Sequence, residues 1–506
     1  MAECLKTISA GACILVSTAV LAGAAQAESL GDAITLAYQT NPSLQAQRAQ
    51  LRATDETYVQ ARAGYRPTAS VTANTAFQWT WLGTSCTVFG CIASPLNSTS
   101  QAATLSLNQP LYTGGRTTAR VHTAEAQVLA GRENLRLQET QVMQQVIQVY
   151  MDVRRDEQAL GIRQDNVGVL QRQVDETRAR FEVGEVTRTD VAQSEAQLAA
   201  AQALLSSAQA QLASDRAAYA TVVGQSPAKL EAEPEFKIFP VTIDQAFDTT
   251  QENNPSIRAA DYGEQAAASN VSELKAERMP QVQFQGSYGY NRAPAELGSP
   301  SISERSAQAA FVYSQPLLSG GAVDSEIRQA IEQDNVSRIQ LEQARRAAVQ
   351  GVSQAWSQLL SAKANIAADE EQVRAATVAF DGTRAEQQAG LRTTLEVLTA
   401  QQVLENAQLD LINARHDAYL AGAAVLQVMG LLEARNLVAG IDQLPGGHSF
   451  EQLKHAWGYL PGVEEGVSAL DSIGSRPISR QPPPVDAPIS TSPSAAPAPA
   501  ATPGSP

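Results

Sequence analysis

The stretch RFEVGEVTRTDV, Arg180–Val191, decides the fold of this chain. It separates two long segments of helical periodicity and places Gly184 where a helix would otherwise continue. A second stretch, EQQAGLRTTLEV at Glu386–Val397, places Gly390 in the matching position, 206 residues further on. A residue just past a helix end commonly needs a positive φ, which glycine adopts without strain. Both glycines are therefore predicted to be the turns of helical hairpins.

The segments on both sides of these glycines carry apolar residues every seven positions. The first series is Val121, Val128, Leu135, Val142 and Val149, and a step of four then leads to Val153, Leu160, Val167, Val174 and Phe181. Such a step is a stutter, which locally unwinds a supercoil. A helix from Gly115 to Phe181 would span on the order of 100 Å. The sequence therefore predicts two long antiparallel hairpins, at about 115–223 and 321–430, rather than compact domains.

Each hairpin belongs to a unit that the chain contains twice. SLGDAITLAYQTNPS begins at Ser29 and TIDQAFDTTQENNPS begins at Thr242, and both open with a helix-capping pattern. The later motifs NQPLYTGG and SQPLLSGG also match. We place the first repeat at 28–225 and the second at 226–432, each with a short helix, two strands and a helical hairpin.

A period of two predicts four strands, at about 68–82, 100–111, 281–291 and 306–317. One face of these segments is apolar and includes Trp and Tyr, and the other carries small uncharged polar residues. A half-buried sheet of a soluble protein would alternate in a similar way. An uncharged polar face suits a wet lumen, aromatic ends suit a membrane interface, and two isolated hairpins would leave edges unpaired. The pattern therefore favours a membrane barrel to which several chains contribute strands.

Composition and charge exclude several classes of protein. Aromatic residues make up only 5% of the 506 residues, which favours thin helical layers over a thick core. The net charge of −15 disfavours nucleic acid as a partner, because phosphate binding needs a basic face. The histidines are scattered, at His122, His416, His448 and His455, and the first two are expected to lie at the surface or in the lumen. We expect no catalytic residue, metal site or cofactor.

The N-terminus has the pattern of an export signal. Lys6 precedes an apolar stretch, and AQA at 25–27 fits a small-residue cleavage site. A single membrane anchor is the alternative, but no charged stop-transfer flank follows. We predict a signal peptide at 1–27, whose removal takes Cys4 and Cys13 with it. No later apolar run reaches about 18 residues, so no transmembrane helix is expected.

Cys86 and Cys91 remain, with four residues between them. In an oxidising compartment they are predicted to form a disulfide that closes a small loop and stabilises it by about 2 kcal/mol. A metal half-site is the alternative, but no second Cys or His cluster completes it. Further on, residues 433–474 have weak periodicity and are expected to wrap around the hairpins. Residues 475–506 are rich in Pro and Ala, and disorder is predicted there.

Taken together, the chain from Ser29 to about Leu432 resembles the TolC family of outer-membrane efflux proteins. The resemblance rests on the duplicated layout and on RFEVGEVTRTDV at the first turn. It implies a fold that is mainly α with a membrane β-barrel. Three chains of a homotrimer would supply a twelve-stranded β-barrel, set on a hollow α-helical barrel that extends from the outer membrane into the periplasm. Cys13 is badly placed as a lipid acceptor, so the chain is closest to the non-lipidated branch of the family, which includes secretion ducts.

The same resemblance implies a gate at the hairpin tips. Family members close the periplasmic entrance through hydrogen bonds and ion pairs between tips, with acidic rings just inside. The matching residues here are Thr189, Asp190, Arg392 and Glu396. Gln387 stands where the family has a gating aromatic and Thr399 where it has a second acidic residue, so the closed state is expected to be held less tightly. The alternative is that these residues are only solvated tip charges.

Two functions follow from these patterns. The first is a passive exit duct in the outer membrane, for type I protein secretion or small-molecule efflux. It would work with a periplasmic adaptor and an inner-membrane ABC or proton-driven transporter. The second is the periplasmic coiled-coil adaptor itself, which should contain one hairpin between small β domains rather than two hairpins interleaved with strand pairs. An exported enzyme is disfavoured, because neither a phosphate loop nor a nucleophile motif has a convincing context.

Overall fold

The structure is a computed structural model of the chain. It describes residues 28–80, 85–88, 90–92, 96–236, 238–293, 302–438, 440, 448–456 and 458–473. The predicted signal peptide, 1–27, and the predicted tail, 475–506, lie outside the described residues. Two compact units share the chain. The first unit is Met1–Val59, Glu125–Glu264 and Asn335–Ala456, and the second is Gln60–Ala124, Gln265–Asp334 and Trp457–Pro506.

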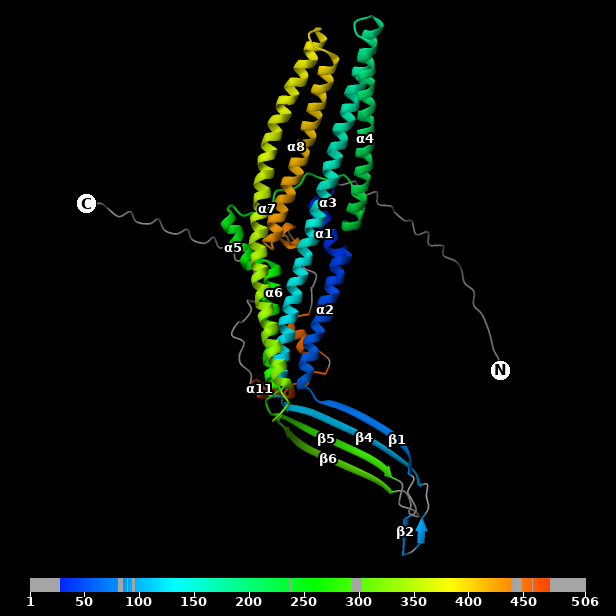
Figure 1. The fold of residues 1–506 in the computed structure, drawn as a ribbon, viewed down its shortest axis with the longest axis vertical. Coiled ribbons are helices and arrows are strands. Elements are labelled where there is room, and N and C mark those ends of the chain that lie inside the picture. The colour runs from blue at the N-terminus through cyan, green and yellow to red at the C-terminus, as the bar shows by residue number, and fades with distance from the viewer. Residues whose placement is uncertain are drawn as a thin grey trace, which may run out of the picture. The chain divides into compact units, whose positions relative to one another are not determined.

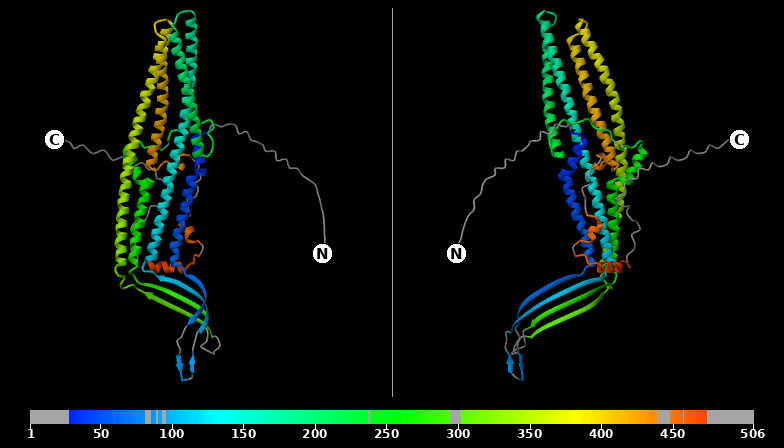
Figure 2. Two further views of the ribbon diagram at one scale, coloured as in Figure 1. Left: turned by 45° about the vertical axis from the view of Figure 1, so that its right-hand side comes forward. Right: turned by 180° about the vertical axis from the view of Figure 1, so that it is seen from behind.

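Two long hairpins dominate the helical part of the chain (Figures 1 and 2). Hairpin 1 consists of α3 (Arg116–Glu182) and α4 (Arg188–Val223), and hairpin 2 consists of α7 (Ala322–Gln388) and α8 (Thr394–Val428). Gly184 lies between the helices of the first hairpin with φ 80°, and Gly390 lies between those of the second with φ 78°. None of the described helices combines the length and the hydropathy that crossing a membrane requires.

The shorter helices also come in matching pairs: α1 (Leu30–Thr40) with α2 (Pro42–Arg62), and α5 (Ile243–Asn253) with α6 (Pro255–Ala276). The repeated Asn-Pro explains the break within each pair. Asn41 ends α1, accepts backbone N–H groups of α2 through Oδ1, and donates Nδ2 to the Val222 carbonyl of α4. Asn254 makes the same contacts one repeat later, with its Nδ2 on the Val428 carbonyl at 2.7 Å.

The core of the first unit lies where α1 meets the lower parts of the hairpin helices. Tyr150 and Tyr219 are fully buried there, and the Tyr219 hydroxyl donates to Glu28 at 2.7 Å. Several positions of the seven-residue series are also buried: Val128, Val142 and Val153. The second repeat has apolar residues at the same spacing, and Val352, Leu359, Val397 and Leu404 among them are buried as well. Others of the series, such as Phe181 near the first tip, are exposed. The apolar stripe is therefore exposed beside the first tip but stays buried beside the second tip, at Val397.

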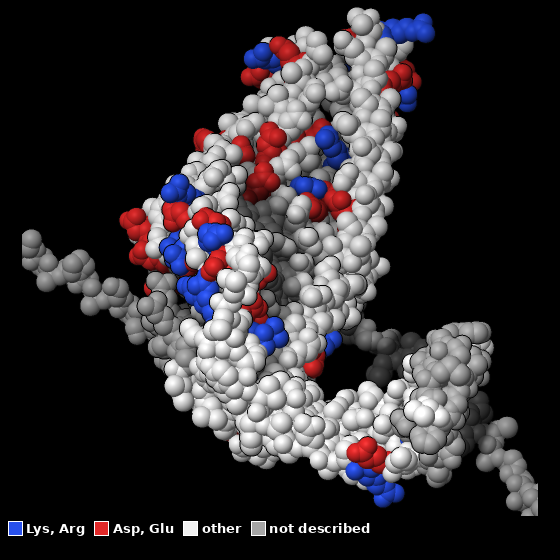
Figure 3. All heavy atoms as spheres, turned by 60° about the horizontal axis from the view of Figure 1, so that its bottom comes forward, with Lys and Arg blue, Asp and Glu red and all other residues white. Residues whose placement is uncertain are grey.

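The second unit contains a four-stranded antiparallel sheet in the order β1-β4-β5-β6. The strands are β1 (Thr68–Thr80), β4 (Leu96–Tyr112), β5 (Gln281–Ala293) and β6 (Ile302–Ser314). The last of these ends before the predicted 317, because Pro316 has no N–H to extend the ladder, and it starts before 306, because Ile302–Arg305 pair with Tyr290–Ala293 of β5. Val71, Leu105 and Tyr288 lie opposite one another on a single face, and all three side chains are exposed. In Figure 3 few charged residues lie over the strands.

The described C-terminal residues include α9 (Ala434–Leu437), α10 (Phe450–Lys454) and α11 (Val463–Ser472). In the second unit α11 contributes two carboxylates that are fully buried. Asp471 accepts hydrogen bonds from the backbone N–H groups of Thr113, Gly115 and Thr118, so it caps the start of α3. Glu464 pairs with Arg62 and Arg66. The weak periodicity of this segment therefore conceals specific polar anchors.

Candidate gate at the hairpin tips

Hairpin 1 ends in a tip that is braced by its own polar residues. Thr187 precedes α4 and accepts a hydrogen bond from the Asp190 N–H, while the Asp190 carboxylate accepts from the Thr187 N–H at 2.9 Å and from its hydroxyl at 2.8 Å. This reciprocal arrangement is a capping box, which satisfies backbone donors that the first helical turn leaves free. Thr189 is exposed on the same turn. The predicted gate residues of hairpin 1 therefore lie together at its tip.

Hairpin 2 repeats the arrangement and adds an arginine. Thr393 and Glu396 form the capping box of α8, with the Thr393 N–H donating to Glu396 at 2.9 Å. Arg392 donates to Glu386 at 2.8 Å and to Glu396 at 3.1 Å. The hydrogen bond from the Thr393 N–H, and then that from Arg392, lower the pKa of the Glu396 carboxyl. The hydrogen bonds to Glu386 and Glu396 raise the pKa of the Arg392 guanidinium.

The resemblance implies ion pairs between tips, and within one chain Asp190 and Arg392 are each engaged inside their own tip. The physical reason is local. A carboxylate three residues past an N-cap is the nearest acceptor for free N–H groups. Arg392 lies in the turn just before the N-cap Thr393, between Glu386 at the end of α7 and Glu396 in the first turn of α8, so both carboxylates are within its reach. A pair between Asp190 of one copy and Arg392 of another belongs to the proposal below.

Gln387 differs from its neighbours at the second tip, because it is buried rather than exposed. Only 3% of the residue is accessible, and no described residue hydrogen-bonds its Oε1. A buried amide oxygen without a partner lowers stability. The effect of Gln387 on the closed state stays a prediction.

A seam of polar contacts joins the two hairpins below the tips, between α3 and α8. Arg163 and Asn166 of α3 donate to the Glu405 carboxylate, at 2.5 and 2.7 Å. Gln401, one turn from Glu405 on α8, donates to the Asn166 side-chain oxygen at 2.9 Å. Sequence reasoning missed these four residues, because polar residues at helical spacing do not reveal which helix they face.

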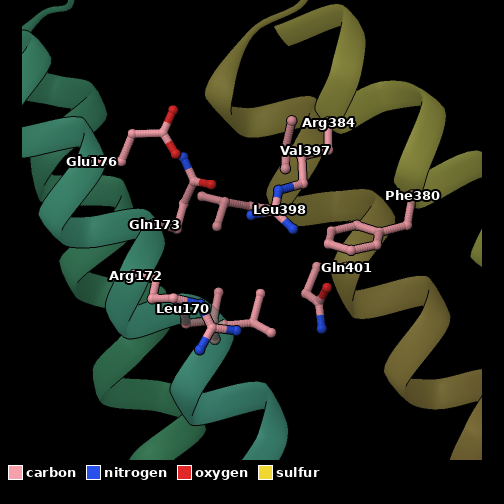
Figure 4. Close-up of a pocket in the computed structure, with 10 residues that line it drawn as sticks. Leu170, Arg172, Gln173, Glu176, Phe380, Arg384, Val397, Leu398 and Gln401 are labelled. Carbon is pink, nitrogen blue, oxygen red and sulfur yellow. The ribbon is translucent and has the colours of Figure 1, made fainter. Parts of the chain in front are cut away.

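A small cavity lies on the tip side of this seam (Figure 4). Its lining comes from α3, α7 and α8 and includes Leu170, Phe380, Leu398 and Gln401. The volume of about 20 Å³ is enough for about one water molecule. The Gln401 Oε1 has no hydrogen-bond partner among the described residues, so a single water there would find an acceptor.

His416 forms a second charged contact of the seam, further from the tips. It was expected at the surface or in the lumen, but it is only 7% exposed, because α3 packs over it. Its Nε2 lies 2.9 Å from Asp152 of α3 and its Nδ1 lies 2.9 Å from Asp417. Ionised carboxylates only accept hydrogen bonds, so this geometry favours the form of His416 with a proton on both ring nitrogens. Burial by itself lowers the pKa of His416, but the hydrogen bonds to Asp152 and Asp417 raise it above its usual value.

Two other expectations concern cysteines and metals. The backbone places Cys86 and Cys91 directly opposite each other in a small ribbon, β2 (Ser85–Thr87) with β3 (Gly90–Ile92). That register suits a disulfide, whose formation stays a prediction. Within the described part of the chain, no group of three or more His, Cys, Asp or Glu residues is arranged to hold a metal ion.

Two capped hairpins repeated in one chain, together with a sheet whose exposed face is apolar, define the class of outer-membrane export channels. Residues 33–225 and 246–431 match the family model described as outer membrane efflux protein. The chain belongs to this family, whose members are channel proteins of the Gram-negative outer membrane that extend into the periplasm. This membership supports the channel and not the adaptor.

Individual comparisons agree with the family. The chain is 33% identical to outer membrane efflux protein BepC of Brucella suis, over 89% of this chain and 96% of that protein. It is 25% identical to alkaline protease secretion protein AprF of Pseudomonas aeruginosa, over 80% of this chain and 85% of that protein. The crystal structure of VceC from Vibrio cholerae superposes with a TM-score of 0.67 at 21% identity, covering 79% of this chain and 96% of that one, which shows the shared fold.

Proposed function

We propose that the chain forms a homotrimeric exit duct of a tripartite export system. The duct does no chemistry, and an inner-membrane transporter supplies the energy. The observation that carries this proposal is the sheet of the second unit. Among the described residues, β1 pairs only with β4 and β6 only with β5, and the face of Leu105 is exposed. Three copies joined edge to edge would close one twelve-stranded barrel, with that face toward lipid and the uncharged polar face toward the lumen.

The gate of this duct lies at the two tips. Their polar residues are presented by capped helix starts, so the tips keep a defined shape. Around a trimer, Asp190 of one copy would adjoin Arg392 of the next, and Thr189 would add a hydrogen bond. Such exposed ion pairs are individually weak. Several of them together hold the pore closed, and because each is weak, a docking adaptor can still shift the equilibrium to the open state.

The partners follow from this arrangement. A periplasmic adaptor would pack its own hairpins into the grooves outside the tips, and an ABC or proton-driven transporter would load the duct. BepC is named as an efflux protein and AprF as an alkaline protease secretion protein, so the relatives support both small-molecule and protein cargo. Crosslinking in cells, followed by identification of the co-purified transporter, distinguishes the two kinds of cargo. An ABC exporter would indicate protein cargo, and a proton-driven pump would indicate small molecules.

Planar-bilayer recordings test the gate. Asp190→Ala and Arg392→Ala should each raise single-channel conductance, because each removes a closing contact. Cells that carry either variant should also become more sensitive to large antibiotics. Arg374→Ala is the matched control, since it breaks an exposed ion pair with Glu371 inside α7 and should leave conductance unchanged. If both tip variants behave as wild type, the tips are not the gate. If the purified chain is a water-soluble monomer, the duct itself is rejected.

A further inference from the structure

Within one chain, the tip charges do not hold the two hairpins together. Asp190 is occupied in the capping box of hairpin 1, and Arg392 is occupied by Glu386 and Glu396 of hairpin 2. Among the described residues, the polar contacts between the hairpins that lie nearest the tips are those of Asn166 with Gln401 and with Glu405, and the charged one is made by Glu405. It lies about three turns past the start of α8 at Thr394, on the order of 16 Å along the helix.

The geometry of this contact is that of a tight clamp. Each carboxylate oxygen of Glu405 has its own donor from α3: Oε1 accepts from Arg163 at 2.5 Å and Oε2 accepts from Asn166 at 2.7 Å. Glu405 and Asn166 are each only 5% exposed. The helices α3 and α8 lie side by side in Figures 1 and 2, so the clamp spans the two hairpins directly.

Apolar contacts on the tip side shield the clamp from water. Leu170 of α3 packs with Leu398 of α8, and Leu404 lies in a neighbouring apolar cluster with Phe380. A charge in such a place is stable only while its partners stay in contact, because separating a buried pair leaves an uncompensated charge. Sliding or parting the hairpins therefore costs far more here than at the exposed tips.

We propose that Glu405, held by Arg163 and Asn166, is a second closure contact of the duct. It is a positioning residue, which keeps hairpin 2 against hairpin 1 within each copy and so determines how far the tips can part. This inference rests on the proposed function, because it assumes that the tips separate when the duct opens. It differs from the tip gate in acting inside one copy and away from the entrance.

Single-channel recording of Glu405→Gln provides the first test. The variant keeps the shape of the side chain and removes the charge that binds Arg163. Open probability should rise on the order of tenfold or more. Glu370→Gln is the matched control, because Glu370 pairs with Arg415 inside hairpin 2 at 3.0 Å with both side chains about half exposed, and it should behave as wild type. Unboiled gels should show trimers for both variants. Wild-type behaviour of Glu405→Gln, or an equal effect of Glu370→Gln, overturns the proposal.

A cross-link provides the second test and does not depend on the stability of Glu405→Gln. Asn166→Cys and Gln401→Cys, whose native side chains touch, are joined by a short bis-methanethiosulfonate in the Arg392→Ala background. The cross-link should return the conductance to the closed level, and a reductant that cleaves the cross-link should raise the conductance again. In each single-cysteine variant, the same reagent should leave the conductance unchanged. A locked channel that conducts like the unlocked one contradicts the proposal. Failure of the exit-duct function would instead appear as an absence of channels in the wild type.

Discussion

Gly430 shows how one residue fixes the lower end of a hairpin. It follows α8 with φ 71°, and a Cβ there would lie 2.5 Å from the Asn253 carbonyl oxygen and 2.9 Å from the Pro255 ring. Backbone of the hairpin and backbone of the α5–α6 break therefore meet without room for a methyl group. Because the two backbones lie so close, the side chain of the neighbouring Asn254 can donate a hydrogen bond to the Val428 carbonyl. The sequence could predict a glycine at the helix end, but not that the Asn-Pro break would pack on it.

Two alanine substitutions separate this role from helix propensity. Gly430→Ala should lower the free energy of unfolding by more than about 1 kcal/mol, because the positive φ and the close carbonyl are both unfavourable for alanine. Gly161→Ala, in the middle of α3 with open space around its Cβ, should raise it by about 0.5–1 kcal/mol. Thermal unfolding followed by circular dichroism measures both. Shifts of the two midpoints in the same direction would contradict the packing argument.

At the scale of elements, the accuracy of prediction followed the strength of periodicity. A period of seven marked the long helices, and a period of two marked the strands, because side chains of one face recur with the period of the element. The α3–α8 seam could not be predicted in this way. Asn166 and Glu405 are ordinary polar residues in the sequence, and only packing makes them partners. His416 was misplaced for the same reason, since its buried position depends on α3, which supplies Asp152, whereas Asp417 is its neighbour on α8.

The protonated His416 makes the seam sensitive to pH. Its folded pKa lies above the unfolded value of about 6.5, so its contribution to stability is complete below that value and is lost as pH rises through the raised folded pKa. The midpoint of thermal unfolding should therefore fall as pH is raised from about 6 to about 9. His416→Gln, which cannot titrate, should show a flatter profile. If the unfolding midpoint of wild type and of His416→Gln depends on pH in the same way, Asp152 and Asp417 do not stabilise a protonated His416.

At the scale of the whole molecule, the sheet of the single chain is incomplete. Among the described residues, β1 is paired with β4 and β6 is paired with β5, so each of these outer strands keeps one open edge. Alternating side chains along β4 put Leu105 on the apolar exposed face and Ser106 on the polar one, where its hydroxyl lies 2.7 Å from that of Ser70. A soluble sheet would have to cover the apolar face with protein, whereas a membrane barrel exposes it to lipid.

Neighbouring lysine substitutions test which of these environments the sheet occupies. Leu105→Lys would place a charge on the proposed lipid face near the middle of β4, at a cost of about 2–4 kcal/mol if that face lies at the bilayer midplane. The amount of heat-resistant trimer in outer-membrane fractions should fall sharply. Ser106→Lys, one residue along, would point into the proposed lumen, so trimers should persist while the ion selectivity of the channel changes. In water both faces of an open sheet are wet, so equal tolerance of the two lysines would mean that β4 does not face lipid.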